Sequence, residues 1–381
     1  MINERISAIP HDAGHAPARG EKLRAVEATR GFAALAVVLF HANASSKLMG
    51  GTDIRLLTLG KHGVDFFFVL SGYIIFFVHA KDIGLLYPAK EYALKRFVRL
   101  VPVLWLVVIS YGLVRYFLGQ PLTLRQFASS IMLYPSVSQP MPVVLWTLRH
   151  EVLFYVAFFF AIINRLLGLT LFFIWTALVS VQVVLVVWGR PIVGLTSFFM
   201  SSFELNFIMG AGVALLHRRI QFVSSTTPLI ISILLLLSIF ALEIYFDIRR
   251  GGDLDYISLP ATLWTIVLGF AFSLFLHGIL RAEQKIRVPE ACITIGAASY
   301  SIYLIHTPIN SVLQHFLIKL PHDVLVSPAV HLLLFVTGTA AGVAIYFAVE
   351  RPVARSFRRY LARAKHKSVA SDPPCLETVI R

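Results

Sequence analysis

The chain repeats long stretches of apolar residues, and this repetition constrains its fold more than any other feature of the sequence. A bilayer has a hydrocarbon core about 30 Å thick, which roughly 20 helical residues can cross. Residues 171–188 are apolar on every face, whereas a strand of a membrane barrel alternates in polarity over about ten residues. With a mean hydropathy of +0.76 and 57% hydrophobic residues, the sequence predicts an all-α, polytopic integral membrane protein.

The apolar stretches give about ten transmembrane helices with short connections. The predicted spans are residues 26–45, 63–80, 96–118, 143–163, 169–188, 199–217, 227–246, 259–279, 296–318 and 328–350. We expect three regions: an N-terminal tail at 1–24, one transmembrane domain at 25–352 and a basic C-terminal tail at 353–381. Because the outer loops are too short to fold as domains, the chemistry is expected among the helices.

The net charge of +14 is distributed unevenly between the two sides of the membrane. An even number of spans puts both termini on one side, and a cytoplasmic N-terminus leaves about 23 Lys and Arg inside against about 9 outside. We therefore expect cytoplasmic termini and lipid, not nucleic acid, as the partner of these charges. The basic segment 351–367 is expected to lie against anionic headgroups. Two cysteines, Cys292 and Cys375, favour neither a disulfide framework nor a metal site.

The first predicted span contains two ionisable residues, Arg30 and His41, which are eleven positions apart. At about 100° per residue they fall within roughly 20° of one helix face, and they are separated by about 16 Å along the axis. Arg30 is then near the cytoplasmic boundary and His41 in the outer half. Such groups are expected to line an interior cavity. The alternatives are an Arg30 that reaches to the headgroups and a His41 that is an interfacial, hydrogen-bonded residue.

The second span begins with GVDFFFVLSG, in which Asp65 is placed at the outer end and Ser71 and Gly72 at mid-depth. Gly72 allows close backbone approach. Asp65 is either an N-cap or a partner that meets His41 and orients its imidazole as a base.

The third span carries Arg96 and Arg99 one helical turn apart near the cytoplasmic face. Two guanidinium groups directed inward suit the diphosphate of a nucleotide-bearing donor. The alternative is ordinary positive charge at the cytoplasmic boundary.

Two further spans contain runs of polar residues. In the fourth, Arg149, His150 and Glu151 precede Tyr155; Glu151 is interpreted as a sugar ligand or as the partner of a cation such as Arg149. In the ninth, Tyr300, Tyr303 and His306 repeat at three-residue spacing, where His306 is either functional or a packing residue.

Together these motifs resemble the membrane-bound acyltransferase family three, which includes sugar O-acetyltransferases. The resemblance lies in Arg30 with His41, the FFxxSG element, the RxxR element of Arg96 and Arg99, WTLxxE ending at Glu151, SYxxYLxH ending at His306, and Glu350-Arg351-Pro352. The motifs occur in the same order and cover nearly the whole membrane region. The amino-acid sequence around Asp65 is most similar to that of the exopolysaccharide acetylase branch.

The resemblance implies an O-acyltransferase of the bacterial inner membrane that uses cytoplasmic acetyl-CoA or another acyl-CoA as donor substrate, with no tightly bound cofactor and no metal. Its acceptor would be a carbohydrate or lipid-linked oligosaccharide. Membrane lipids are expected partners, and a homo-oligomer or association with polysaccharide-synthesis machinery stays open. The expected catalytic residues are His41 as general base, Asp65 and Glu151; the donor-binding residues are Arg30, Arg96, Arg99, Ser71 and Gly72; the acceptor-binding residues are Tyr155, Tyr303 and His306.

Two other functions remain as alternatives on the residues alone. A polar face through a helix bundle also suits a transporter or flippase of lipid-linked sugars. A structural or sensory membrane subunit would need neither paired arginines nor a buried base.

Overall fold

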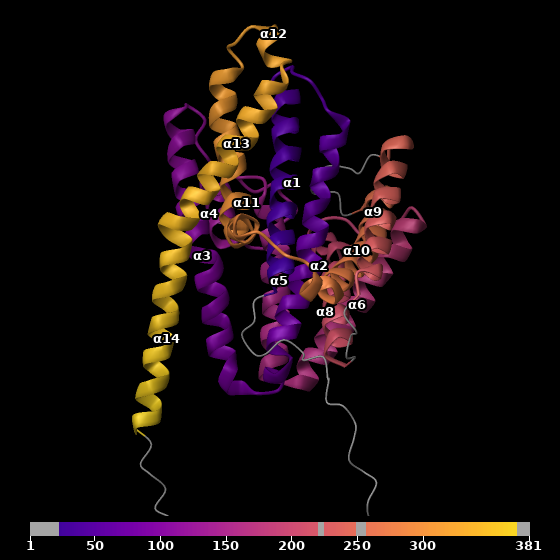
Figure 1. Cartoon of the computed structure of the whole chain (residues 1–381), viewed down its shortest axis with the longest axis vertical. Helices are drawn as coiled ribbons and strands as arrows, with labels where there is room; N and C mark the ends of the chain where they lie inside the picture. Colours follow the sequence, from indigo (N-terminus) through magenta and orange to yellow (C-terminus); the bar gives the residue numbers. More distant parts are fainter. Residues whose placement is uncertain (1–22, 220–224, 249–256, 372–381) are drawn as a thin grey trace, which may run out of the picture.

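A computed structural model describes residues 23–219, 225–248 and 257–371, without the side chains of residues 219 and 364–371. Most of the predicted tails at 1–24 and 353–381, including Cys375, therefore lies outside the residues whose side chains are described. In the described ranges the chain is helical and contains no β-strand (Figure 1). The expected all-α class is thus confirmed.

The helices follow one another with short connections. They are α1 (Arg24–Leu48), α2 (Gly63–His79), α3 (Leu86–Phe117), α4 (Leu124–Met132), α5 (Leu145–Ile163), α6 (Arg165–Val187), α7 (Leu195–Phe199), α8 (Phe203–Arg219), α9 (Thr227–Tyr245), α10 (Leu259–Ala282), α11 (Glu290–Leu317), α12 (His322–Leu325), α13 (Pro328–Ile345) and α14 (Arg351–Ser371). Three 3-10 turns, η1 (Arg55–His62), η2 (Ala80–Asp82) and η3 (Glu283–Lys285), and a π-helical turn, η4 (Tyr346–Glu350), extend some of them.

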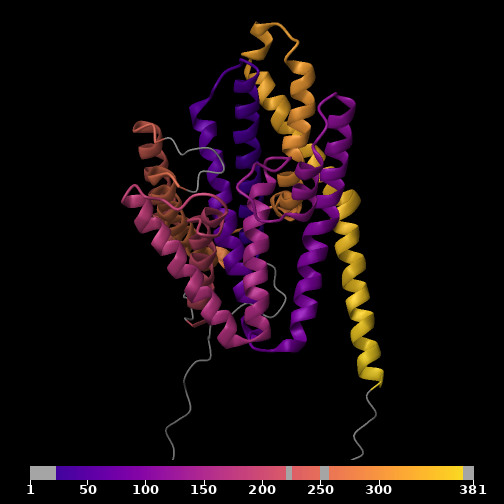
Figure 2. The ribbon, with the colours of Figure 1, turned by 180° about the vertical axis from the view of Figure 1, so that it is seen from behind.

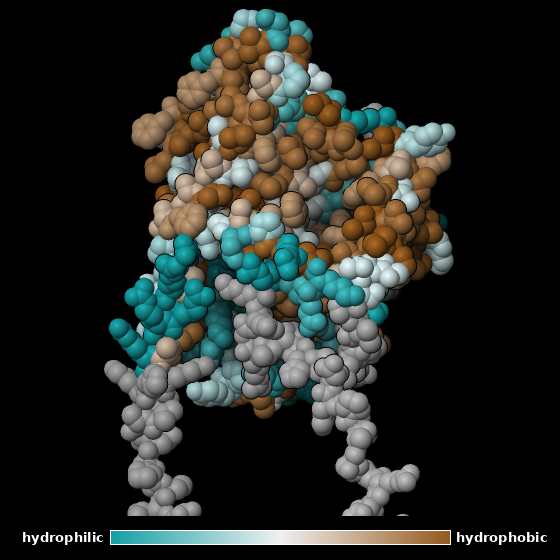
Figure 3. All heavy atoms as spheres, in the orientation of Figure 1, coloured by the Kyte–Doolittle hydropathy of each residue, from teal (hydrophilic) through white to brown (hydrophobic). Residues whose placement is uncertain are grey.

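Ten helical segments in the described part of the chain are long and apolar enough to cross a membrane. Each coincides with one of the ten spans predicted from the sequence, so the protein is polytopic, as expected. In the space-filling view, hydrophobic residues cover the upper part of the visible face, and hydrophilic residues gather lower down, around α14 (Figure 3). An apolar surface of this extent is what contact with lipid requires.

Some helix boundaries differ from the predicted spans. α3 begins at Leu86, ten residues before the predicted start at residue 96, because Lys and Glu are good helix formers although they lower the hydropathy. Arg96 therefore lies well inside a helix. The predicted surface segment 351–367 forms most of α14, which continues from α13 through η4 and runs lengthwise beside α3 (Figures 1 and 2).

The first and ninth spans, α1 and α11, pack side by side although they are distant in sequence. Two glycines permit this approach: a Cβ on Gly31 would lie 2.8 Å from the backbone nitrogen of Gly296, and a Cβ on Gly296 would lie 1.9 Å from the oxygen of Glu27. At one end, Arg24 pairs with Glu290, 2.5 Å away. Contacts at successive levels along both helices show that they run parallel, and α13 packs against both.

The helix α2 packs closely against α8 and enters the bundle beside α1. A Cβ on Gly72 would lie 2.0 Å from the oxygen of Phe207 in α8, so this glycine provides the close backbone approach expected of it. At the other end, a Cβ on Gly63 would lie 2.6 Å from the oxygen of Ala33, near the middle of α1. α2 therefore starts at mid-depth, after η1.

Candidate functional site

A cavity of about 140 Å³ lies between α1, α2, α3, α5 and α11. Its polar lining brings together side chains that are far apart in the sequence: Arg30, Ser71, Arg96, Arg99, Thr147, Glu151, Tyr155, Ser299, Tyr300 and Tyr303. We call this space the arginine cavity. Its lining includes most of the residues that the sequence predicted to be functional, and three of these lining residues are arginines.

Two of the arginines in the cavity are held by carboxylates. Arg99 hydrogen-bonds to Glu350, and Glu350 also accepts a hydrogen bond of 2.6 Å from Ser301. The nearest carboxylate oxygen of Glu27 is 3.5 Å from Arg30, which also donates to the hydroxyl of Ser299 at 3.3 Å. These contacts hold both side chains near the cavity, although a third of the Arg99 side chain stays accessible.

Arg96 is held mainly by aromatic rings. Its guanidinium carbon lies 5.5 Å from the ring centre of Tyr92 and 5.3 Å from that of Tyr155, both within the range of cation–π attraction. One terminal nitrogen is 3.4 Å from Nε2 of His79. Its Nε is buried and has no hydrogen-bond partner among the described residues. Unlike Arg30 and Arg99, Arg96 makes no ion pair with a carboxylate among the described residues.

Glu151 lies in the arginine cavity. It accepts hydrogen bonds from the hydroxyl of Tyr155 and, at 3.4 Å, from that of Ser71. From the sequence, Glu151 was interpreted as a sugar ligand or as the partner of a cation such as Arg149. Residues two apart on a helix differ by about 200° in direction, so Arg149 faces the other way. Arg149 donates to the backbone oxygens of Ser136 and Ser138 in the loop before α5.

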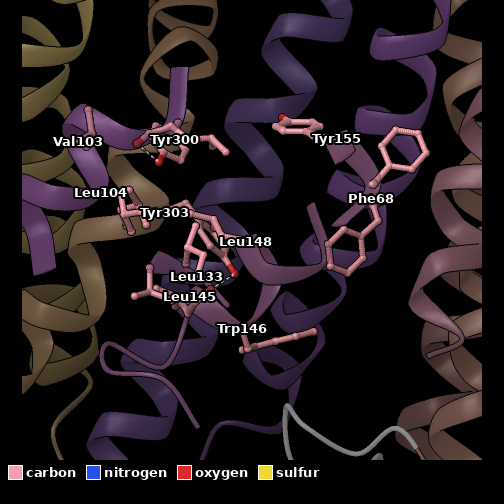
Figure 4. Packing of buried hydrophobic residues seen from close by; sticks show 14 of the residues in the cluster. Phe68, Val103, Leu104, Leu133, Leu145, Trp146, Leu148, Tyr155, Tyr300 and Tyr303 are labelled. Atoms are coloured by element: carbon pink, nitrogen blue, oxygen red, sulfur yellow. Dashed lines mark hydrogen bonds between the residues drawn. The ribbon is translucent and has the colours of Figure 1, made fainter. Parts of the chain in front are cut away.

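Three tyrosines form an aromatic wall around the same space. Figure 4 shows Tyr155, Tyr300 and Tyr303 in one cluster with Phe68 and Leu148. Tyr300 donates to the oxygen of Leu100 at 2.7 Å, and its ring lies beneath Arg99. The hydroxyl of Tyr303 is 2.9 Å from that of Thr147. Tyr155 and Tyr303, expected to bind the acceptor, therefore line the cavity that holds the arginines.

The histidines His41 and His306 contact each other beyond the cavity. Nδ1 of His41 is 3.1 Å from Nε2 of His306, and the ring centres are 5.0 Å apart. His306 is one helical turn beyond Tyr303, and their ring centres are 5.9 Å apart. The cavity and the histidine pair thus lie at successive levels along α11.

Asp65, predicted to be either an N-cap or a partner of His41, lies in a different cluster. One carboxylate oxygen is 3.3 Å from Nδ1 of His62, and the other accepts from Asn206 at 3.3 Å. Nε2 of His62 is 2.7 Å from Glu243. Asp65 follows Gly63 by two residues, so it points away from α1, which Gly63 contacts.

Depth also separates Asp65 from His41. Because Gly63 contacts Ala33, which is eight residues before His41, the start of α2 lies about 12 Å along the α1 axis from the histidine. The structure therefore does not bring Asp65 and His41 together. The expectation failed because it assumed that α2 starts at the outer surface.

Other predicted residues lie outside the lining of the cavity. Gly72 packs against α8, and His306 is fully buried behind Tyr303. His150 is also fully buried, with Nδ1 at 2.7 Å from Glu204. Glu350 is recognisable in the sequence only as part of a motif, and the spacing of residues gives no sign that it holds Arg99.

Comparison with known proteins adds two findings. The family model described as an acyltransferase domain matches residues 23–349, which include the whole lining of the arginine cavity and both histidines. The exopolysaccharide production protein ExoZ of Rhizobium meliloti (strain 1021) is 29% identical over 324 residues, covering 79% of this chain and 92% of that protein. No solved structure matches the chain.

Proposed function

Because this chain belongs to the acyltransferase family, we propose that it transfers an acyl group, most simply acetyl, from cytoplasmic acyl-CoA to a hydroxyl of a cell-surface or lipid-linked carbohydrate. The similarity to a protein named for exopolysaccharide production supports a carbohydrate acceptor. The donor is a substrate, and we propose no tightly bound cofactor. The bacterial inner membrane is the proposed location, because it gives one protein access to both substrates.

The single observation that carries this proposal is the convergence of Arg30, Arg96 and Arg99 on one cavity. Guanidinium groups bind phosphate oxygens through paired, charge-assisted hydrogen bonds. The carboxylates of Glu27 and Glu350 compensate two of the arginines, which leaves Arg96 as the strongest attraction for an anion. The phosphates of an acyl-CoA fit this requirement.

The separation between the arginines and His41 supports the same donor. Arg30 and His41 are about 16 Å apart along α1. In an acyl-CoA, the phosphates and the thioester are at opposite ends of an extended pantetheine arm. Phe67 and Tyr303, whose ring centres are 6.0 Å apart, line the intervening level. A donor with its phosphates on the arginines would extend its thioester toward the histidine.

In the proposed reaction, His41 is the general base. It accepts the proton of the acceptor hydroxyl while that oxygen attacks the thioester carbonyl. The new carbon–oxygen bond replaces the carbon–sulfur bond, and the proton passes from His41 to the leaving thiolate. The products are an ester and free coenzyme A, so the reaction consumes no net proton.

The proposal is tested with membranes that contain the protein, radiolabelled acetyl-CoA and extracted glycan or lipid-linked oligosaccharide. The wild type should label the glycan, and His41→Ala should reduce the rate by about 10²- to 10⁴-fold, the usual contribution of a general base. His315→Ala, on the outer part of α11, is the matched control and should retain the rate.

Full activity in a normally folded His41→Ala protein would remove His41 as the base. If the wild type transfers no label but moves lipid-linked sugar across vesicles, the protein is a transporter and the proposed function is wrong.

A further inference from the structure

The two histidines of the candidate site have the same local geometry. Nδ1 of His41 is 3.1 Å from the backbone oxygen of Val37, and Nδ1 of His306 is 3.1 Å from that of Ile302. In each case the carbonyl belongs to the residue four positions earlier on the same helix. Nε2 of His306 is then directed at Nδ1 of His41, 3.1 Å away.

These contacts fix which nitrogen carries hydrogen in the neutral pair. A carbonyl oxygen only accepts hydrogen bonds, so Nδ1 of His306 must carry the hydrogen, and its Nε2 is an acceptor. Nδ1 of His41 faces two acceptors, the Val37 oxygen and Nε2 of His306, so it also carries a hydrogen. The basic lone pair of His41 is then on Nε2, the nitrogen directed away from His306.

His306 is held firmly in this arrangement. Its side chain is completely buried, and α13 closes over it at Gly338, where a Cβ would lie 3.1 Å from the Cβ of His306. The close contact of Gly31 and Gly296 fixes α1 against α11 and therefore sets the height of His41 relative to His306. A buried residue held from three helices is poorly placed to bind a carbohydrate, the role that the sequence suggested.

We propose that His306 is the positioning residue of the catalytic base. It orients His41 and selects the tautomer whose Nε2 accepts the proton of the acceptor hydroxyl. When His41 becomes protonated, its Nδ1–H bond to His306 becomes charge-assisted and stabilises the imidazolium. A neutral histidine thus takes the part that an aspartate takes in a Ser-His-Asp triad. This inference rests on the proposed function, in which His41 is the base.

Two substitutions of similar size separate positioning from packing. The terminal amide of glutamine reaches approximately the location of histidine Nε2, so His306→Gln can still accept from His41. The amide of asparagine reaches only the location of Nδ1, so His306→Asn can bond to Ile302 but leaves His41 without this acceptor. Residues that orient a histidine at a metal site typically contribute 10- to 100-fold, and we expect an effect of the same size for His306.

We therefore expect His306→Gln to lower kcat only a few-fold, and His306→Asn to lower it by about 10- to 100-fold. KM for acetyl-CoA should be unchanged in both, because the arginine cavity is untouched. His315→Asn on the same helix is the control. Equal losses in both variants, or wild-type kcat in a folded His306→Asn protein, would overturn the positioning role. An inactive wild type would instead overturn the proposed function itself.

A spectroscopic measurement tests the tautomer without relying on transfer. In protein labelled with ¹⁵N-histidine, the ring signals lost in His41→Gln identify His41 and should show hydrogen on Nδ1. His306→Asn should shift these signals toward a mixture of tautomers, whereas His306→Gln should preserve them. Hydrogen on Nε2 of His41 in the wild type would contradict the inference.

Discussion

At the scale of single residues, the three arginines of the cavity differ in what holds them. Arg30 and Arg99 have carboxylate partners, Glu27 and Glu350, whereas Arg96 lies between two tyrosine rings and beside His79. A cation whose charge is already paired gains less from a phosphate than one whose partners are neutral. Arg96 should therefore contribute most to donor affinity.

The substitution Arg96→Gln tests this ranking. A hydrogen bond to a charged group contributes about 1.5–3 kcal/mol, so KM for acetyl-CoA should rise by about 10- to 100-fold. kcat should change less, because the histidine pair lies at a different level along α11. Arg125→Gln, at an exposed position on α4, is the control. Steady-state transfer kinetics give both constants, and an unchanged KM would exclude Arg96 from donor binding.

The sequence predicted part of this site because some of its spacings are local. Arg96 and Arg99 are one turn apart, so their common direction follows from helix geometry. The positions of Asp65 and Glu151 depend on where α2 and α5 begin relative to α1, which no local spacing encodes. The contact of His41 with His306 joins residues 265 positions apart, and the hydropathy pattern gives no sign of it.

At the scale of helices, the contact between α1 and α11 aligns the two levels of the candidate site. Arg30 and Ser299 meet at the level of the arginine cavity, and His41 and His306 meet farther along the same two helices. Gly31 and Gly296 make this alignment possible, because no side chain separates the two backbones. A larger side chain at this contact would push α1 and α11 apart and would displace both the arginine cavity and the histidine pair.

Gly296→Ala should therefore impair both stability and activity. The added Cβ would meet the backbone oxygen of Glu27 at 1.9 Å, which the neighbouring helix must move to accommodate. Overpacking of this kind costs about 1–3 kcal/mol, seen as a lower melting temperature in detergent, and the rate of transfer should fall with it. Gly212→Ala has nothing within 4 Å of the new Cβ and should match the wild type. If the two variants had the same melting temperature and the same rate of transfer, the contact at Gly296 would not be what aligns α1 with α11.

At the scale of the whole molecule, the number and approximate places of the spans could be predicted, but their arrangement could not. Hydropathy reports how apolar a segment is, and lipid-facing and buried helices look alike by that measure. α6 and α11 are both spans, yet α11 carries the site and α6 exposes much of its apolar surface. Which helices touch depends on glycine contacts and buried polar groups spread over the full chain.

The distribution of charge also predicts the orientation of the molecule in the membrane. About 23 Lys and Arg fall on the N-terminal side of the membrane and about 9 on the other, so the positive-inside rule predicts a cytoplasmic N-terminus. Lys90 lies in the first turns of α3 and Arg125 lies beyond its other end, and both are exposed. In a protein with Cys292 and Cys375 replaced by serine, Arg125→Cys should react with a membrane-impermeant maleimide added to intact cells.

Under the same conditions, Lys90→Cys should react only after the cells are permeabilised. This result matters for the mechanism, because α3 carries Arg96 and Arg99 in the half nearer Lys90. A cytoplasmic Lys90 puts the arginine cavity toward the compartment that contains acyl-CoA and His41 toward the side where surface carbohydrate is available. The reverse labelling pattern would separate the cavity from its proposed donor and exclude acyl-CoA as its ligand, even if His41 proved essential.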